Sequence, residues 1–367
     1  ELREKEPPIE GVVLVGRIPV PMVRDAQHLT SAFKMDQVRF PRRRSSVPSD
    51  RFYDDLDLRF RFLERDGEEP HLFYYSLRHD SPQRVRREIY SARLFPPAEG
   101  EEGSARIGAF LERVAARKAA GPEPIRRMLL VAGHGYNSES LNAWRWEHLT
   151  LREQLPQLFR PGGWLRSYWH GMTYELKGII FRELRMAPLQ VALFHAHGAP
   201  AAQYILGSPP TPSTRPRMEE IKRYLRGRLR RAKRRDKNPA AVQVDLMERY
   251  GLPLAWFAGA FDPEVTAADE KVAAKQDIAA AEVARLAPRA ELVILDQCFN
   301  GRFIDRPHVA GAYLFGPGET AAVMANTVNV LQDIWADQDL ERLNRGMRVG
   351  AFHRRRHYLE SHLFGDP

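Results

Sequence analysis

The sequence contains a single cysteine, Cys298, and this scarcity excludes several classes of protein. One cysteine cannot form an intrachain disulfide, and a Cys-x-x-Cys zinc or redox site needs two. A long apolar run is also lacking, because the longest stretch without a charged residue, 186–214, is interrupted by prolines. We therefore expect neither a disulfide scaffold nor a membrane-spanning helix.

The positive charge is unevenly distributed. The chain has 56 Lys and Arg against 47 Asp and Glu, a net charge of +9. Residues 215–237 contain twelve Lys and Arg against three acidic residues, so the rest of the chain has 44 of each sign. The excess of positive charge thus belongs to one segment. For this reason we do not expect the chain as a whole to bind nucleic acid.

Short apolar runs alternate with longer amphipathic stretches, which is typical of parallel strands covered by helices. The predicted strands are 12–15, 72–75, 88–94, 128–131, 190–194, 254–257, 292–295 and 321–324. The predicted helices are 105–120, 139–155, 218–233 and 267–286. This pattern predicts an α/β fold. A proline-rich acidic stretch at 95–103 divides it into a lobe of residues 1–103 and a domain of residues 104–367, with a basic insertion at 208–240.

Two predicted strands end in residues with catalytic potential. The run VALFHAHG ends in His197 and Gly198, and LVILDQCFNG ends in Cys298 and Gly301. Functional groups in open α/β sheets gather at the carboxyl ends of strands. A histidine can act as base for a cysteine nucleophile, and glycine lets backbone N–H groups approach an oxyanion. The combination indicates acyl transfer.

The chain has a strand that ends in His-Gly and a later strand that ends in Asp-x-Cys-x-x-Gly. This order of motifs resembles that of the caspase-like clan of cysteine peptidases. Closer similarity is to the gingipain-like peptidase family, in CFNGRF (298–303), ETAAVMAN (319–326) and LFGDP (363–367). LVGRIP (14–19) and IYSARL (89–94) resemble strands of that family's amino-terminal lobe. The resemblance covers nearly the whole chain. It implies a caspase-like (caspase/hemoglobinase) parallel sheet flanked by helices, with a smaller α/β amino-terminal lobe.

The resemblance implies a cysteine endopeptidase that acts through a thioester acyl-enzyme on a protein or peptide. His197 would be the general base and Cys298 the nucleophile, and the amides of Gly198 and Cys298 would form the oxyanion hole. No cofactor is required. The family favours a secreted or cell-surface location, and a cytoplasmic one stays open. We expect a chain that opens at Glu1 to be a processed or trimmed piece.

One departure from the family concerns the base. His195 and Ala196 precede His197, where the family often has a small polar residue, and His134-Gly135 is a competing His-Gly pair. We favour His197 because its predicted strand is nearer in sequence to that of the cysteine.

Asp296, two residues before Cys298, is the candidate for recognising a basic substrate side chain. The Asp-x-Cys spacing is similar to that of metacaspases, which cut after Arg or Lys. The alternative is a buried carboxylate satisfied by backbone amides.

The basic insertion lies between the predicted His and Cys strands, where caspase-like enzymes often carry a loop that is cut during maturation. Such an enzyme could process itself near Arg226, Arg230, Arg231, Arg234 and Arg235. A solvated helix face is the simpler interpretation.

Four carboxylates near the amino terminus are weak candidates for calcium, because hard oxygen ligands suit that ion: Asp50, Asp54, Asp55 and Asp57. They lack EF-hand spacing, and a solvated acidic loop is the alternative.

The competing hypothesis for function is a catalytically silent caspase-like module. In that case the basic segment would dock a protein partner or nucleic acid.

Overall fold

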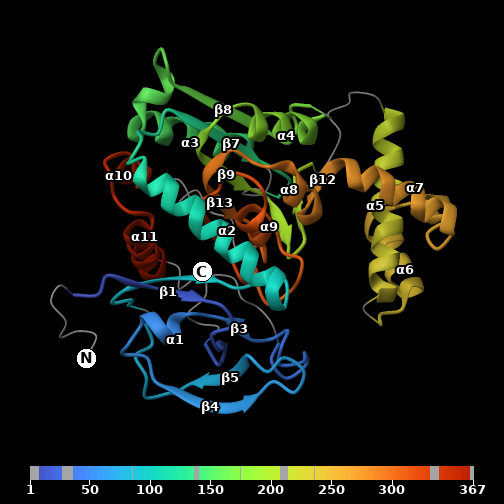
Figure 1. Cartoon of the computed structure of the whole chain (residues 1–367). Coiled ribbons are helices and arrows are strands. Elements are labelled where there is room, and N and C mark those ends of the chain that lie inside the picture. Colours follow the sequence, from blue (N-terminus) through green and yellow to red (C-terminus); the bar gives the residue numbers. More distant parts are fainter. Residues whose placement is uncertain are drawn as a thin grey trace.

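The computed structural model describes residues 8–26, 36–84, 86–135, 140–173, 175–206, 214–234, 236–330 and 339–363. Within them the chain is a mixed α/β protein built on parallel strands that helices flank (Figure 1). An amino-terminal lobe lies beneath a central body, and a helical arm projects from the side of that body.

The body is built around a five-stranded sheet in which every neighbouring pair is parallel. Its strands, in order across the sheet, are β14 (Ala322–Ala325), β13 (Ala290–Asp296), β9 (Leu189–His195), β7 (Arg127–Ala132) and β8 (Trp164–Trp169). The chain adds β8 on one side of β7 and then crosses to add β9 on the other. Sites in such sheets form where the strand order reverses, which here is the carboxyl end of β7 and β9.

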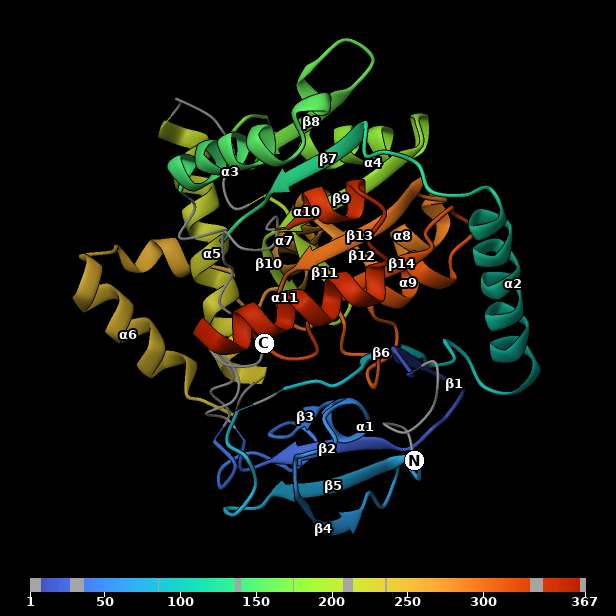
Figure 2. The ribbon, with the colours of Figure 1, turned by 90° about the vertical axis from the view of Figure 1, so that its left-hand side faces the viewer.

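Helices bury both faces of this sheet, which explains why its strands are almost wholly apolar. Leu129 and Val131 of β7 belong to a core with α4 (Leu176–Met186), α8 (Ala280–Leu286) and α9 (Val309–Phe315). Met128 and Leu130 belong to a core on the opposite face with α3 (Leu141–Gln154), α10 (Leu340–Asn344) and α11 (Val349–Leu363). Figure 2 shows α11 lying in front of the sheet.

The amino-terminal lobe contains a four-stranded sheet in the order β3 (Val47–Pro48), β2 (Val20–Arg24), β5 (Leu72–Leu77) and β4 (Phe60–Arg65). Only β2 and β5 are parallel to each other. The short helix α1 (Arg51–Asp54) follows β3, and β1 (Gly11–Val15) pairs with β6 (Tyr90–Leu94) in parallel. Helix α2 (Gly100–Ala119) then leads into the central sheet.

The arm is a sequence insertion between two strands of a small antiparallel sheet, which lies beside the central sheet. That sheet consists of β10 (His197–Ala199), β11 (Ala202–Tyr204) and β12 (Asp277–Ala279). Between β11 and β12 the chain forms α5 (Thr214–Arg234), α6 (Pro239–Tyr250), the short 3-10 helix η4 (Leu254–Phe257) and α7 (Pro263–Gln276). The arm has its own apolar core, made of Leu225, Leu229, Leu246, Phe257 and Ala260.

Most predicted strands of the body and lobe are found, and two element assignments are wrong. Residues 254–257 form η4 rather than a strand. The apolar run is too short to distinguish the two, and its Trp256 and Phe257 pack on the core of the arm rather than in a sheet. The predicted helix 267–286 is broken by β12 at Asp277. Helix α2 begins at Gly100, within the predicted linker, and the arm reaches residue 276, well beyond 240.

In the described part of the chain, no helix has the length and apolar character needed to cross a membrane.

Candidate functional site

Three strand ends meet at one edge of the central sheet. Asp296 at the end of β13 is in register with His195 at the end of β9, and His195 is in register with Ala132 at the end of β7. The residues that follow these strands are therefore brought to the same edge, and they include His134, His197 and Cys298.

The two competing histidines are neighbours. The His197 N–H donates to the His134 carbonyl at 2.7 Å, and the rings meet edge to face with centroids 5.2 Å apart. Gly135 lies against them with φ +89°, and a Cβ at Gly135 would overlap the His197 ring. Glycine is required here for both its backbone conformation and its lack of a side chain.

The backbones after the His and Cys strands also touch. A Cβ on Gly198 would lie 2.5 Å from the carbonyl oxygen of Cys298. Asn300 joins the two turns, because its Nδ2 donates to the carbonyls of Ala199 at 2.6 Å and Ala202 at 3.0 Å. The structure thus brings Gly198 and Cys298, the predicted oxyanion residues, into contact.

The Cys298 thiol is partly buried and hydrogen-bonds to the main chain. Its Sγ donates to the Val330 carbonyl and accepts from the Val330 N–H, both at 3.4 Å. Among the described residues, neither imidazole hydrogen-bonds to it. Burial raises the pKa of the thiol above its ordinary value, the Asp296 charge adds to the rise, and the Val330 N–H opposes it. The thiol is neutral in this arrangement.

The turn that follows the cysteine is strained. Phe299 has φ +61°, which is uncommon for a residue with a side chain, and its N–H donates to the Val328 carbonyl at 3.0 Å. Strained backbone of this kind is held in place by its surroundings and concentrates at functional sites.

A buried ionic cluster lies beneath the site. His195 is fully buried, with Nδ1 2.8 Å from Asp296 Oδ2 and Nε2 2.7 Å from Glu147 Oε1 of α3. Burial alone would lower the pKa of His195, but the two carboxylates, Glu147 first, outweigh it and raise that pKa to about 10. The imidazole is therefore protonated at neutral pH and joins β9, β13 and α3.

This cluster changes the interpretation of Asp296, which is 6% exposed and bonded to His195. From the sequence alone, Asp296 is either an open carboxylate for a basic substrate or a buried one held by backbone amides. It is buried, and it bonds to His195, which from the sequence is only a departure from the family. Glu147 was missed, although its spacing of four from the buried Ala143 and Leu151 places it on the inner face of α3.

Four of the five arginines proposed for self-cleavage lie on helix α5. Arg226 donates to Asp269 of α7 at 2.9 and 2.7 Å, and Arg230 donates to the same carboxylate at 2.8 Å. Arg231 and Arg234 are exposed on α5, and Arg235 lies outside the described residues. A helix held by such ion pairs must unwind locally before a peptidase can cut it.

The calcium candidates do not form a cation site. Asp50 pairs with Arg93 at 2.6 Å, and the buried Asp54 pairs with Arg51 at 2.8 Å. Asp55 accepts from the Arg86 N–H, and burial raises its pKa to about 6, whereas Asp57 is exposed. In the described ranges, no group of three or more His, Cys, Asp or Glu side chains could hold a metal ion.

A cavity of about 510 Å³ lies between the amino-terminal lobe and β14. Its walls include Val13, Tyr90 and Met324. Cys298 and His197 do not line it, but Asp296 and Gly301 do, so the cavity reaches the strand-end site from the side of the lobe.

No protein-family model, curated protein or solved structure matches this chain.

Proposed function

We propose that the chain is a cysteine endopeptidase with a caspase-like catalytic domain. The observation that supports it best is that His197 and Cys298 follow neighbouring parallel strands, with the Gly198 backbone against the Cys298 carbonyl. The motif resemblance to gingipain-like peptidases implies catalytic roles for the same two residues.

In this proposal His197 takes the proton from the Cys298 thiol, and the thiolate attacks the scissile carbonyl carbon. The Gly198 and Cys298 amides stabilise the oxyanion of the tetrahedral intermediate. When the C–N bond breaks, the imidazolium gives its proton to the leaving amine and a thioester remains. Water, deprotonated by His197, then hydrolyses the thioester and restores the thiol.

The thiol must leave Val330 before His197 can take its proton. Its raised pKa and its two contacts with that main chain describe a resting arrangement. Substrate binding would have to replace those contacts.

Cleavage after Arg or Lys belongs to the proposal through the Asp-x-Cys spacing. Because Asp296 is buried and bonded to His195, a basic substrate side chain would have to enter this cluster to reach it. Comparing kcat/KM for matched peptide substrates with Arg or Gln before the scissile bond tests this directly. Equal kcat/KM values for the two substrates would refute the specificity for basic residues but would not refute the peptidase proposal.

A second candidate function, the catalytically silent binding module, is favoured by the neutral, main-chain-bonded thiol. It predicts that Cys298 reacts with no substrate analogue.

A peptidyl acyloxymethyl ketone ending in Arg separates the two functions, with intact-mass detection of an adduct on Cys298. The peptidase predicts labelling that His197→Ala abolishes and that His79→Ala, a change at an exposed histidine, leaves intact. Parallel labelling of His134→Ala tests the competing base. Absence of labelling in wild-type protein, with and without Ca²⁺, would support the binding module.

A further inference from the structure

Helix α5 carries an exposed stripe that its own arm does not use. Ile221, Tyr224, Arg228 and Arg231 recur at intervals of three and four residues, so they share one face of the helix. Leu225, Leu229 and Ala232 turn to another face and are buried. The exposed fractions of Ile221 and Tyr224 are 41% and 57%, which is high for apolar side chains on a helix that has a core to enter.

The cations of this stripe differ from those beside them. Arg226 and Arg230 share the Asp269 carboxylate as their ion-pair partner, as described above. Neither Arg228 nor Arg231 forms an ion pair with a carboxylate of the described residues. The stripe therefore combines uncompensated positive charge with exposed apolar surface, which is the composition of a recognition surface.

The stripe is directed toward the candidate site. His197, Tyr204 and Asp277 form one row across the small sheet, because His197 pairs with Tyr204 and Tyr204 pairs with Asp277. Burial and the charge of Asp277 raise the pKa of Tyr204, while Arg231 opposes the rise, so Arg231 is close enough to act on this row.

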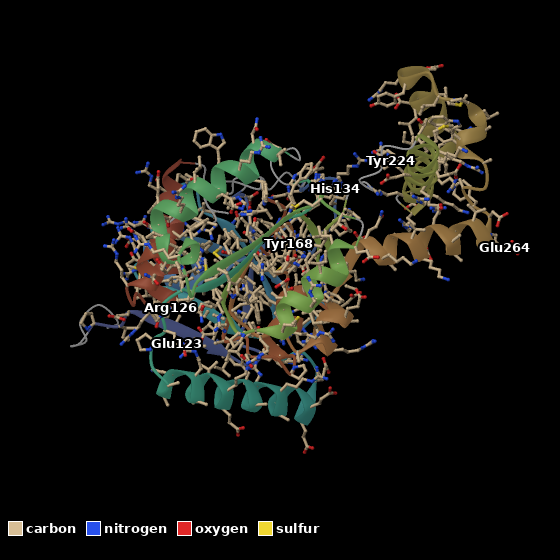
Figure 3. The ribbon with its side chains drawn as sticks, turned by 90° about the horizontal axis from the view of Figure 1, so that it is seen from above. Glu123, Arg126, His134, Tyr168, Tyr224 and Glu264 are labelled. Atoms are coloured by element: carbon tan, nitrogen blue, oxygen red, sulfur yellow. The ribbon has the colours of Figure 1, made fainter. Side chains whose placement is uncertain are left out.

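Figure 3 shows the same relationship from above. Tyr224 is on the side of α5 nearest the body, and His134 is at the edge of the body that faces the arm. An extended chain that leaves the strand-end site on this side would pass between the two.

We propose that the α5 stripe is an exosite that binds an acidic segment of the polypeptide substrate, remote from the scissile bond. This inference rests on the proposed peptidase function and adds a substrate class to it. Arg228 and Arg231 would pair with carboxylates, and Ile221 and Tyr224, one to two turns before Arg228 on the helix, would cover neighbouring apolar side chains. Asp277 is a nearby carboxylate that is about half ionised at neutral pH, because burial raises its pKa to about 7, with Lys177 opposing the rise and Glu282 adding to it.

A polypeptide fits the stripe better than nucleic acid does. Nucleic-acid affinity comes from many phosphate contacts, about six to ten in well-bound duplexes, each needing a cation. The stripe offers two described cations, Arg228 and Arg231, preceded on the same face by Ile221 and Tyr224, an arrangement that suits mixed acidic and apolar side chains.

The test uses the full chain with Cys298→Ala, so that binding is measured without turnover. Fluorescence anisotropy at low ionic strength would follow a labelled oligoglutamate peptide, with the matching oligoglutamine peptide as control. We expect Arg228→Gln with Arg231→Gln to raise the Kd for oligoglutamate by about tenfold, an effect that salt reduces. The matched control is Lys271→Gln with Lys275→Gln, two exposed lysines on α7 outside the stripe, which should change it less than about twofold.

Equal Kd values for the two double variants would overturn the exosite, as would equal binding of the glutamate and glutamine peptides. A single-stranded oligonucleotide that displaces oligoglutamate at lower concentration than the peptide itself would reassign the stripe to nucleic acid and overturn the proposal. Failure of the ketone to label Cys298 in wild-type protein would refute the peptidase alone, because the binding measurement needs no active thiol.

Discussion

His195 Nδ1 lies 2.8 Å from Asp296 Oδ2, and the two residues are also register partners on neighbouring parallel strands. One contact therefore fixes the strand that leads to His197 against the strand that leads to Cys298. Glu147 extends it to helix α3. The relative positions of His197 and Cys298 therefore depend on His195, a charged side chain with no access to solvent.

Replacing His195 by Leu should strongly destabilise the fold. The substitution leaves two carboxylates buried without their cation, and breaking a buried ion pair costs about 3–5 kcal/mol. Urea unfolding followed by far-UV circular dichroism measures the loss. The exposed His79→Leu should change the free energy of unfolding by less than about 0.5 kcal/mol. A similar small change for His195→Leu would show that the cluster adds no stability.

Stability should fall as the pH rises above neutrality. The folded pKa of His195, about 10, exceeds the unfolded value of about 6.5, so the folded state holds the extra proton between them. The stabilisation is complete below about pH 6.5 and is lost as pH rises through about 10. Glu147→Gln removes the carboxylate that raises this pKa most, so its alkaline loss of stability should be smaller and should end at a lower pH. Parallel stability curves for the two proteins would contradict this origin.

Gly135→Ala should disrupt the histidine pair. The backbone strain alone costs about 1–2 kcal/mol, because φ is +89°, and the new methyl group overlaps the His197 ring. Gly121→Ala is the matched control, with φ +83° and open space around the added carbon. In thermal unfolding, both variants should show a similar loss of stability from the strained backbone. Only Gly135→Ala should lose ketone labelling of Cys298, and equal labelling of the two would refute the role of this glycine.

Self-processing should be slow in the wild-type chain and faster in Asp269→Asn. Arg226 and Arg230 lose their charged partner in that variant, so α5 unwinds more readily. Incubation followed by mass spectrometry would locate cuts between residues 226 and 235, and Cys298→Ala in the same background should abolish them. Cleavage that persists with Cys298→Ala would come from another peptidase. An intact Asp269→Asn chain would refute self-processing at this helix.

The sequence predicts the central strands well, because β7, β9 and β13 are buried on both faces and so appear as unbroken apolar runs. It fails at 254–257, where an apolar run of the same length packs into the core of the arm rather than into a sheet. Residues 277–279 were hidden inside a helical pattern, since a strand of three residues leaves no period to detect.

The candidate site is predictable in its membership and less so in its contacts. His197, Gly198 and Cys298 follow from the rule that functional groups gather at strand ends. The partner of Asp296 depends on which residues of β9 and β13 stand opposite each other, and on a glutamate from a helix far away in the sequence. Neither relationship has a local sequence signal that fixes it.

The arm leaves the body just after Tyr204 and returns at Asp277, and these two residues stand opposite each other in the small sheet. An excursion whose ends are adjacent can be replaced by a short turn without shifting the register of any remaining strand. The segment that contains the chain's whole excess of positive charge is thus a removable module. Related chains could gain, exchange or lose it while the strand-end residues keep their positions.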